Sequence, residues 1–165
     1  FVLITAFANT SGAHFNPFVS LAMFLRKKIN GKLLIIYIPA QILGCLLGVM
    51  LANVFFEHDI LELSTKNRDG FHIFLSEIIA TFGLIFIIFA TQKDGKITIA
   101  ASVATYIMAG YWFTSSTSFA NPAVAIARTF TDSFTGINYL NTPTYILAEF
   151  LGALIAVYFI KKLIK

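Results

Sequence analysis

Charged residues are scarce in this chain of 165 residues, where they make up only 12% of the sequence against 58% for hydrophobic residues. The mean hydropathy of +0.80 lies far from that of a water-soluble domain. The net charge of +4 does not indicate nucleic-acid binding, because the basic residues fall between long apolar runs and not on one water-facing surface. These features predict an all-α protein of the lipid bilayer.

Cysteine is nearly absent as well, and the single Cys45 excludes an intrachain disulfide. His14, His58 and His72 lie in different segments, without the i, i+3 or i, i+4 spacing of metal ligands. The sequence also carries no nucleophile motif and no phosphate-binding loop. We therefore expect no metal, no cofactor and no enzymatic activity.

Long apolar runs are abundant. A hydrocarbon core about 30 Å thick is crossed by roughly 20 helical residues, and four segments predict spanning helices on that measure: 33–56, 74–91, 97–114 and 144–164. Residues 1–8 are too short to span and carry no basic leader, so we expect the end of a spanning helix rather than a signal peptide. Glycines at helix-contact spacing, among them Gly44, Gly48 and Gly152, favour close packing between helices.

Two Asn-Pro pairs lie between these segments, in GAHFNPFVSLAMF (12–24) and SFANPAVAIARTF (118–130). Asparagine is a natural N-cap and proline suits the first helical turn, so each pair predicts a short helix, over 17–26 and 122–131. Neither helix can cross a bilayer alone. If the two starts meet at the midplane, their positive ends repel cations, while Asn amides and loop carbonyls suit a neutral hydroxylated solute.

An internal repeat follows the Asn-Pro pairs, since YIPAQILGCLLG (37–48) and YILAEFLGALIA (145–156) agree at six of twelve positions. If the four spans alternate, nine basic residues fall on one side of the membrane and three on the other. This bias predicts a cytoplasmic C-terminus, a cytoplasmic Asn16 loop and an external Asn121 loop. Inverted repeats with broken helices at the midplane are typical of transport proteins.

Four stretches of this sequence resemble the aquaporin, or major intrinsic protein, family: SGAHFNP, AQILG, SEIIATFG and FANPA. The resemblance covers essentially the whole chain and implies an inverted-repeat bundle with two half-membrane re-entrant helices. In family terms the chain lacks the first spanning helix and most of the second. It implies one channel domain over 1–165, with 1–56 the remainder of the first repeat and 71–165 the second, assembled as a homotetramer.

The candidate site residues form four groups. The pore signature comprises Asn16, Pro17, Phe18, Asn121, Pro122 and Ala123. The expected pore carbonyls belong to Gly12, Ala13, His14, Thr117 and Phe119. The resemblance assigns the selectivity filter to Ala109, Ser118 and Val124, with the fourth position upstream of Phe1. It also implies that Glu77 braces the pore loops; Glu149, in its own span, is as well suited to bracing as to snorkelling.

Two departures from the family pattern bear on the solute. Phe18 stands where the family usually has alanine, and Val124 stands where water and glycerol channels of the family carry arginine. Arg128 follows one turn later, and we expect it to snorkel to the external interface or pair with Asp132 rather than lean toward the pore. The chain also resembles a bacterial branch associated with arsenic-resistance operons.

The predicted filter is therefore wide and weakly polar, suited to water, glycerol, urea or neutral metalloid hydroxides such as arsenous acid. Two other functions stay open at this stage. The chain could be an ion-coupled secondary transporter that uses Glu77 or Glu149 as its proton site, or an inactive channel fragment. Dependence of uptake on a pH gradient separates the first of these from a passive channel.

Overall fold

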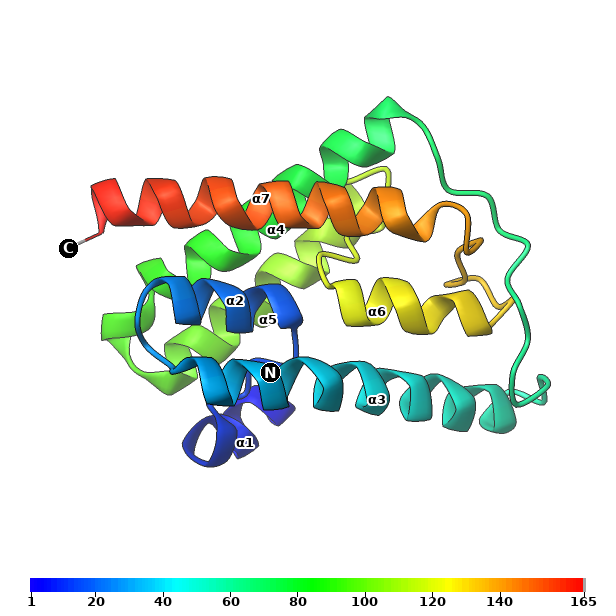
Figure 1. Ribbon diagram of the computed structural model, residues 1–165, viewed down its shortest axis with the longest axis horizontal. Coiled ribbons are helices and arrows are strands. Elements are labelled where there is room, and N and C mark those ends of the chain that lie inside the picture. The colour runs from blue at the N-terminus through cyan, green and yellow to red at the C-terminus, as the bar shows by residue number, and fades with distance from the viewer. Residues whose placement is uncertain (165) are drawn as a thin grey trace.

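The computed structural model describes residues 1–164, and its regular structure there is helical (Figure 1). The α-helices are α1 (Val2–Ser11), α2 (Pro17–Leu25), α3 (Gly31–Phe55), α4 (Phe71–Ala90), α5 (Lys96–Phe113), α6 (Pro122–Ala127) and α7 (Thr142–Leu163). Two short 3-10 helices, η1 (Gln92–Asp94) and η2 (Arg128–Phe130), follow α4 and α6. This order agrees with the all-α bundle that the sequence predicts.

Three of the helices, α3, α4 and α7, are long and apolar enough to cross a membrane. They confirm three of the four predicted spans, with ends within three residues of those expected. The fourth predicted segment is also a helix, α5, with 18 residues, a length of about 27 Å and ends within one residue of those expected, but it is not among the helices apolar enough to cross a membrane. Its lysine, threonines and tyrosines lower its hydropathy.

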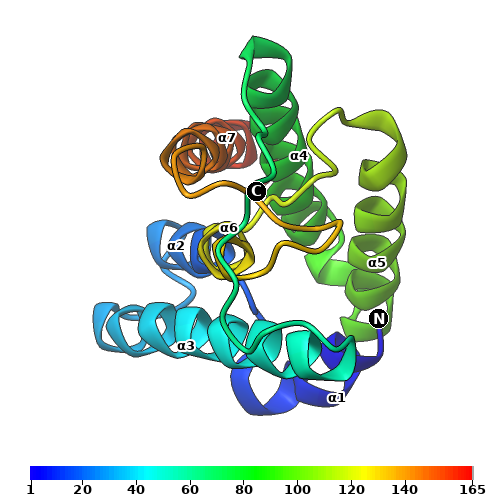
Figure 2. The same cartoon turned by 90° about the vertical axis from the view of Figure 1, so that its right-hand side faces the viewer.

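The short helices α2 and α6 lie end to end at the centre of the bundle and run in opposite directions from their adjacent N-termini (Figure 1). Seen along their common axis, they lie between α3 and α7 and contact both (Figure 2). The predicted helix 122–131 is shorter than expected, because the α-helix ends at Ala127 and tightens into η2. There the Thr129 hydroxyl donates to the Ile126 carbonyl at 2.6 Å.

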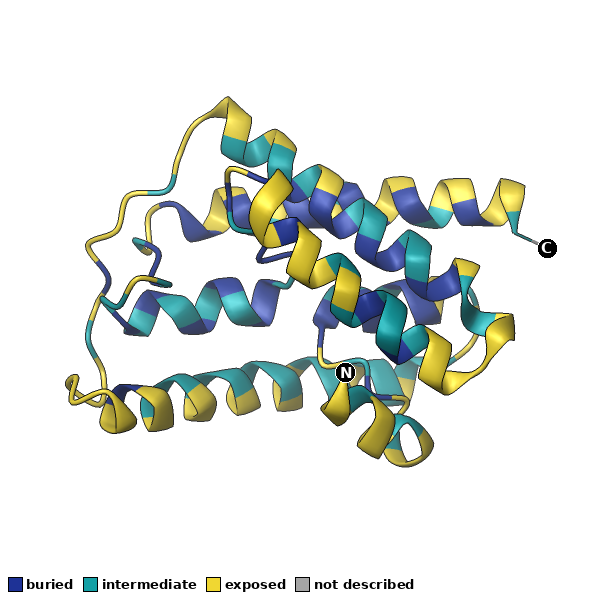
Figure 3. Ribbon diagram, turned by 180° about the vertical axis from the view of Figure 1, so that it is seen from behind, coloured by how far each residue is buried: buried dark blue, intermediate teal, exposed yellow. Residues whose placement is uncertain are grey.

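Burial is greatest where α4 meets α7, whereas most of α3 is exposed or half-buried (Figure 3). Small side chains allow the two buried helices to approach closely, among them Ala80 on α4 and Ala153 and Ala156 on α7. The outward apolar side chains of α3 suit contact with lipid, because hydrocarbon is as apolar as they are. The interior of the bundle is therefore organised around α4, α7 and the two short helices.

The glycines divide between these environments. A Cβ at Gly152 would collide with the Ile78 carbonyl and lie 3.1 Å from the Phe82 nitrogen, both in the α4 backbone. At Gly44 and Gly48, a Cβ would meet nothing within 4 Å. The expectation of close helix contact is confirmed at Gly152 and wrong at Gly44 and Gly48, which lie on the exposed helix α3.

Replacement of Gly152 by alanine should therefore push α4 away from α7. The atoms that the new Cβ would meet belong to the α4 backbone, which cannot rotate aside as a side chain can. We expect Gly152→Ala to lower the free energy of unfolding in detergent by about 1–3 kcal/mol, the usual cost of overpacking. The matched variant Gly44→Ala should leave stability unchanged or raise it slightly, because alanine favours helix and meets open space. Equal destabilisation by both variants would contradict this packing.

Outside the spanning helices, Asp132 ties the loop after η2 to the loop between α3 and α4. Its carboxylate accepts hydrogen bonds from the Thr65 backbone N–H at 2.8 Å, from the Thr65 hydroxyl at 3.0 Å and from the Ser64 hydroxyl at 3.4 Å. The Thr65 N–H is the main cause that lowers the pKa of Asp132 below its ordinary value. The carboxylate is thus held in its charged form.

Because that pKa is lowered in the folded protein, the tie is present at neutral pH and is lost as the pH falls through the lowered pKa. We expect the amide NMR signal of Thr65 to titrate with a midpoint below about 3.9, the ordinary value for aspartate. In Asp132→Asn this titration should vanish. A midpoint at or above the ordinary value would show that the carboxylate gains nothing from Thr65.

Candidate functional site

Each Asn-Pro pair begins a helix in the way that its residue types predict. Asn16 has an extended backbone, and its side-chain oxygen accepts the N–H groups of Phe18 at 2.9 Å and Val19 at 3.4 Å. The Asn121 side-chain oxygen accepts the N–H of Ala123 at 3.1 Å. Proline occupies the first helical position in both cases, where an N–H would have no partner. The two helix starts are therefore fixed by local chemistry.

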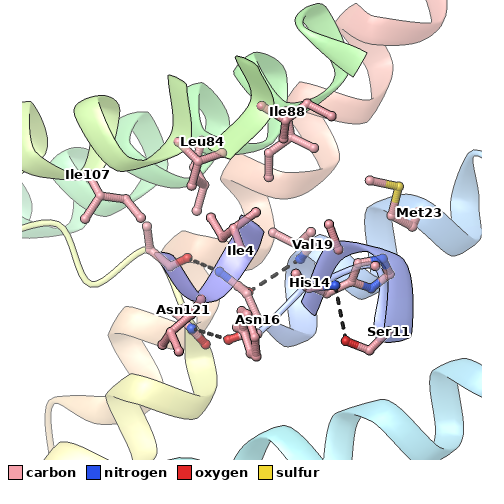
Figure 4. A pocket seen from close by; sticks show the side chains of 18 of the residues that line it. Ile4, Ser11, His14, Asn16, Val19, Met23, Leu84, Ile88, Ile107 and Asn121 are labelled. Atoms are coloured by element: carbon pink, nitrogen blue, oxygen red, sulfur yellow. Dashed lines mark hydrogen bonds between the residues drawn. The ribbon is translucent and has the colours of Figure 1, made fainter. Parts of the chain in front are cut away.

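The two asparagines also bind each other's loops. The Asn16 amide nitrogen donates to the Ala120 carbonyl at 2.6 Å, and the Asn121 amide nitrogen donates to the Phe15 carbonyl at 2.9 Å. Figure 4 shows the two side chains facing each other across this junction. Each amide nitrogen carries two hydrogens, so one donor on each remains after the crossed bond is made. Asn16 and Asn121 both line the large central cavity.

The backbones leading to the two asparagines have matching conformations. Positive φ angles occur four, three and one residues before each asparagine, at Gly12, Ala13 and Phe15 and at Thr117, Ser118 and Ala120. Most of these residues have side chains that disfavour the left-handed region, so packing must hold both loops in place. The sequence repeat thus extends to the detailed path of the chain.

Serines placed five residues before each asparagine help to hold these loops. The Ser11 hydroxyl accepts the Ala13 N–H at 3.3 Å, and the Ser116 hydroxyl accepts the Ser118 N–H at 3.2 Å. The tyrosines that open the two repeated segments complete the arrangement. Tyr37 donates to the Ser11 carbonyl at 2.8 Å, and Tyr145 donates to the Ser116 carbonyl at 3.5 Å. Sequence reasoning missed these four residues, although the shared Ser-x4-Asn-Pro spacing was a usable signal.

Two buried carboxyl groups hold the second Asn-Pro loop. Glu77 on α4 accepts the Phe119 N–H at 2.9 Å with one oxygen and the Ala120 N–H at 2.8 Å with the other. Glu149 on α7 accepts the next N–H, that of Asn121, at 2.9 Å. Both side chains have no exposed surface. Within residues 1–164, the second oxygen of Glu149 has no hydrogen-bond partner.

The cavity beside the two asparagines has a volume of about 1030 Å³. Of the remaining predicted site residues, those that line it are Gly12, Ala13, His14, Ser118, Phe119 and Val124. Those that do not are Pro17, Phe18, Glu77, Ala109, Thr117, Pro122, Ala123 and Glu149. The ring of Phe18 instead packs on Phe150 of α7 at 5.8 Å, and the His14 ring hydrogen-bonds the Ser20 hydroxyl at 3.0 Å.

The structure does not bring Ala109 to this cavity. Ile107 and Tyr111 of α5 line it, and Ala109, two residues from each, lies on the exposed opposite face of the helix. Counting back from Asn121 fixes a position along α5 but not the rotation of the helix about its axis. The α5 side chains at this level of the cavity are therefore large, where a small residue is expected.

The expected pairing of Arg128 with Asp132 was wrong. Arg128 is half-buried, lines the cavity, and places its guanidinium 4.3 Å from the centre of the Phe119 ring. It does not pair with Asp132, whose carboxylate is bound to Thr65. Within the part of the chain that the structure describes, the one salt bridge joins His58 to Glu62. The same residues contain no cluster of His, Cys, Asp or Glu side chains able to hold a metal ion.

Comparison with known proteins agrees with this geometry. Residues 1–159 match the family described as Major intrinsic protein. The chain is 44% identical over 155 residues to "Aquaglyceroporin AqpS" of Rhizobium meliloti (strain 1021). The aligned residues cover 94% of this chain and 66% of that relative. It is 29% identical over 170 residues to "Probable aquaporin TIP3-2" of Arabidopsis thaliana, with 94% and 60% covered. For human "Aquaporin-4" the identity is 27% over 163 residues, with 93% and 50% covered. The chain thus spans between half and two thirds of these relatives.

The two glutamates should respond differently to amide substitution. In Glu77→Gln one backbone N–H must face an NH2 group, because both oxygens of Glu77 accept. In Glu149→Gln the oxygen that accepts the Asn121 N–H can be kept, and the NH2 group replaces an oxygen that has no partner. We expect Glu77→Gln to lower the free energy of unfolding by about 1–3 kcal/mol and Glu149→Gln by clearly less. Denaturation of purified protein in detergent measures both, and the reverse order would contradict the assignment.

Proposed function

This chain belongs to the major intrinsic protein family, and from that premise we propose that it forms a passive channel for small uncharged solutes through the cavity between its two Asn-Pro loops. The family consists of membrane channels and not of enzymes, and the apolar helices are those of a multi-pass membrane protein. The observation that carries the proposal is the pair of crossed hydrogen bonds between Asn16 and Ala120 and between Asn121 and Phe15.

The crossed bonds supply donors at fixed positions. With one hydrogen of each amide used in the protein, the other can be donated to a solute that passes in single file. Acceptors come from the irregular backbone upstream, where Gly12, Ala13, His14 and Phe119 line the cavity. Donors and acceptors in sequence replace the water that a hydroxylated solute leaves behind.

Cations are excluded in this proposal by the ends of the two short helices. The N-termini of α2 and α6 meet at the asparagines, and helix N-termini carry partial positive charge. An ion would also lose most of its hydration in the cavity, which offers no ring of carboxylates among its lining residues. A neutral solute is not repelled by the helix ends, and the donors and acceptors of the cavity replace the water that it loses.

Glycerol is the leading candidate solute, since Ser118 and Val124 combine one hydroxyl with an apolar surface and a 44% identical relative is called an aquaglyceroporin. Water, urea and neutral metalloid hydroxides such as arsenous acid suit the same lining. We place the filter at Ser118 and Val124; Ile107 and Tyr111 of α5 line the same cavity. We further propose a homotetramer with a cytoplasmic C-terminus, each chain a single domain built from the related halves 1–56 and 71–165.

The geometry gives less support to an ion-coupled transporter. Glu77 and Glu149, which would carry the proton, accept backbone N–H groups of the second Asn-Pro loop and do not line the cavity. We therefore assign them to bracing. An imposed pH gradient should leave the initial rate of glycerol flux unchanged, and absence of any flux would favour an inactive fragment.

A guanidinium at position 124 should narrow the cavity where Ser118 and Val124 both line it. We expect Val124→Arg to lower the ratio of glycerol to water permeability of proteoliposomes, because the larger solute is excluded first, without abolishing glycerol flux, since glycerol channels of the family carry arginine at this position. Stopped-flow light scattering measures both rates. The variant Val124→Ala, which removes volume, should keep or raise glycerol permeability. An unchanged ratio of glycerol to water permeability in Val124→Arg would overturn this filter assignment.

A further inference from the structure

We propose that Arg128 and Phe119 form a binding site for small oxyanions at the α6 end of the cavity. The site lies apart from the asparagines, because Arg128 comes seven positions after Asn121 along α6 and η2, a rise of about 10 Å. Arg128 and Val124 are one turn apart on this segment and both line the cavity. The site is thus displaced along α6 from the central junction.

The ring of Phe119 holds the guanidinium in place. Phe119 is only 6% exposed, and its backbone N–H is bound by Glu77, so the ring sits on a fixed support. The Arg128 guanidinium lies 4.3 Å from the ring centre, within the range of a cation–π contact. An arginine held on an aromatic face loses little further freedom when it binds a ligand.

No acidic side chain within residues 1–164 forms a salt bridge with Arg128. Asp132, the acid nearest in sequence, is bound to Thr65, and Glu62 is bound to His58. Within residues 1–164, no hydrogen bond or salt bridge uses the N–H donors of Arg128. These donors are available to a molecule that enters the cavity.

A second arginine adds positive potential without competing for the ligand. Arg68 lies 5.5 Å from the centre of the same Phe119 ring. Its Nε donates to the Gly136 carbonyl at 2.8 Å and its Nη2 to the Phe134 carbonyl at 2.9 Å. Arg68 is therefore committed to the protein, while Arg128 on the same ring is free.

The chemistry selects the ligand class. A guanidinium presents parallel N–H donors that match two oxygens of a phosphate or carboxylate group, and such charge-assisted pairs are stronger than neutral ones. The unpaired guanidinium of Arg128 favours an anion over a neutral solute, whereas the charge of Arg68 beside the same ring is offset in part by Glu77, which accepts the Phe119 N–H. We therefore assign the site to small inorganic oxyanions, with phosphate as the probe. If the cavity is the channel proposed above, an oxyanion bound here also obstructs the passage of neutral solutes.

Binding of inorganic phosphate to the protein in lipid nanodiscs tests the site directly, by calorimetry or by broadening of the 31P NMR signal. We expect saturable binding that Arg128→Gln weakens at least about tenfold, as for a charged hydrogen-bonding partner. Arg128→Lys keeps the charge but loses the paired donors, so its affinity should be intermediate. The control Lys66→Gln removes an exposed cation outside the cavity and should bind phosphate as the unaltered protein does.

Glycerol flux separates this proposal from the channel proposal. Phosphate should slow glycerol entry in the unaltered protein but not in Arg128→Gln, when compared with chloride at equal ionic strength. If no glycerol passes but Arg128 is needed for phosphate binding, the channel proposal fails and the oxyanion site stands. If glycerol passes and Arg128→Gln binds phosphate as tightly as the unaltered protein, or if Lys66→Gln weakens binding equally, the oxyanion site is wrong.

Discussion

Two crossed hydrogen bonds, one from each asparagine amide to the opposite loop, fix the centre of the molecule. They are needed because neither α2 nor α6 can cross a bilayer alone, so non-helical backbone lies between them. Such backbone is tolerated at membrane depth only where its polar groups are paired or face a wet cavity. The rest of the bundle supplies partners for the polar backbone groups of both loops.

The two loops share one set of hydrogen bonds, and the second loop has a further set from two carboxyl groups. In the second loop, carboxylates from α4 and α7 bind three consecutive N–H groups. That loop can be held only if α4 and α7 are close together, which requires a glycine at position 152. Each loop also has a serine hydroxyl that accepts a loop N–H and a tyrosine that donates to the carbonyl of that serine. These residues are Ser11 and Tyr37 in the first loop and Ser116 and Tyr145 in the second. The close packing of α4 on α7 is thus also what holds the second loop in its conformation.

The sequence predicted the features that depend on neighbouring residues. Asn and Pro side chains act on their own helix start, so the positions of α2 and α6 followed from Asn16 and Asn121 directly. The sequence did not predict features that depend on the rotation of a helix about its axis or on partners that lie far away in the chain or in an irregular loop. The side of α5 that carries Ala109 is set by packing, and the partner of Arg128 is a ring nine residues earlier in an irregular loop. Gly44 and Gly152 have similar sequence surroundings but different neighbours in space.

The positions of Val124 and Arg128 separate two properties that a single side chain could otherwise combine. A large cation at position 124 would both narrow the cavity and charge it. With valine there, width is set by apolar side chains, while the charge sits one turn away on an aromatic support. Because charges in a poorly solvated cavity interact over longer distances than in water, the arginine would repel cations from the proposed channel while apolar side chains set its width. In the proposed channel, selection by size and selection by charge would then act at different depths.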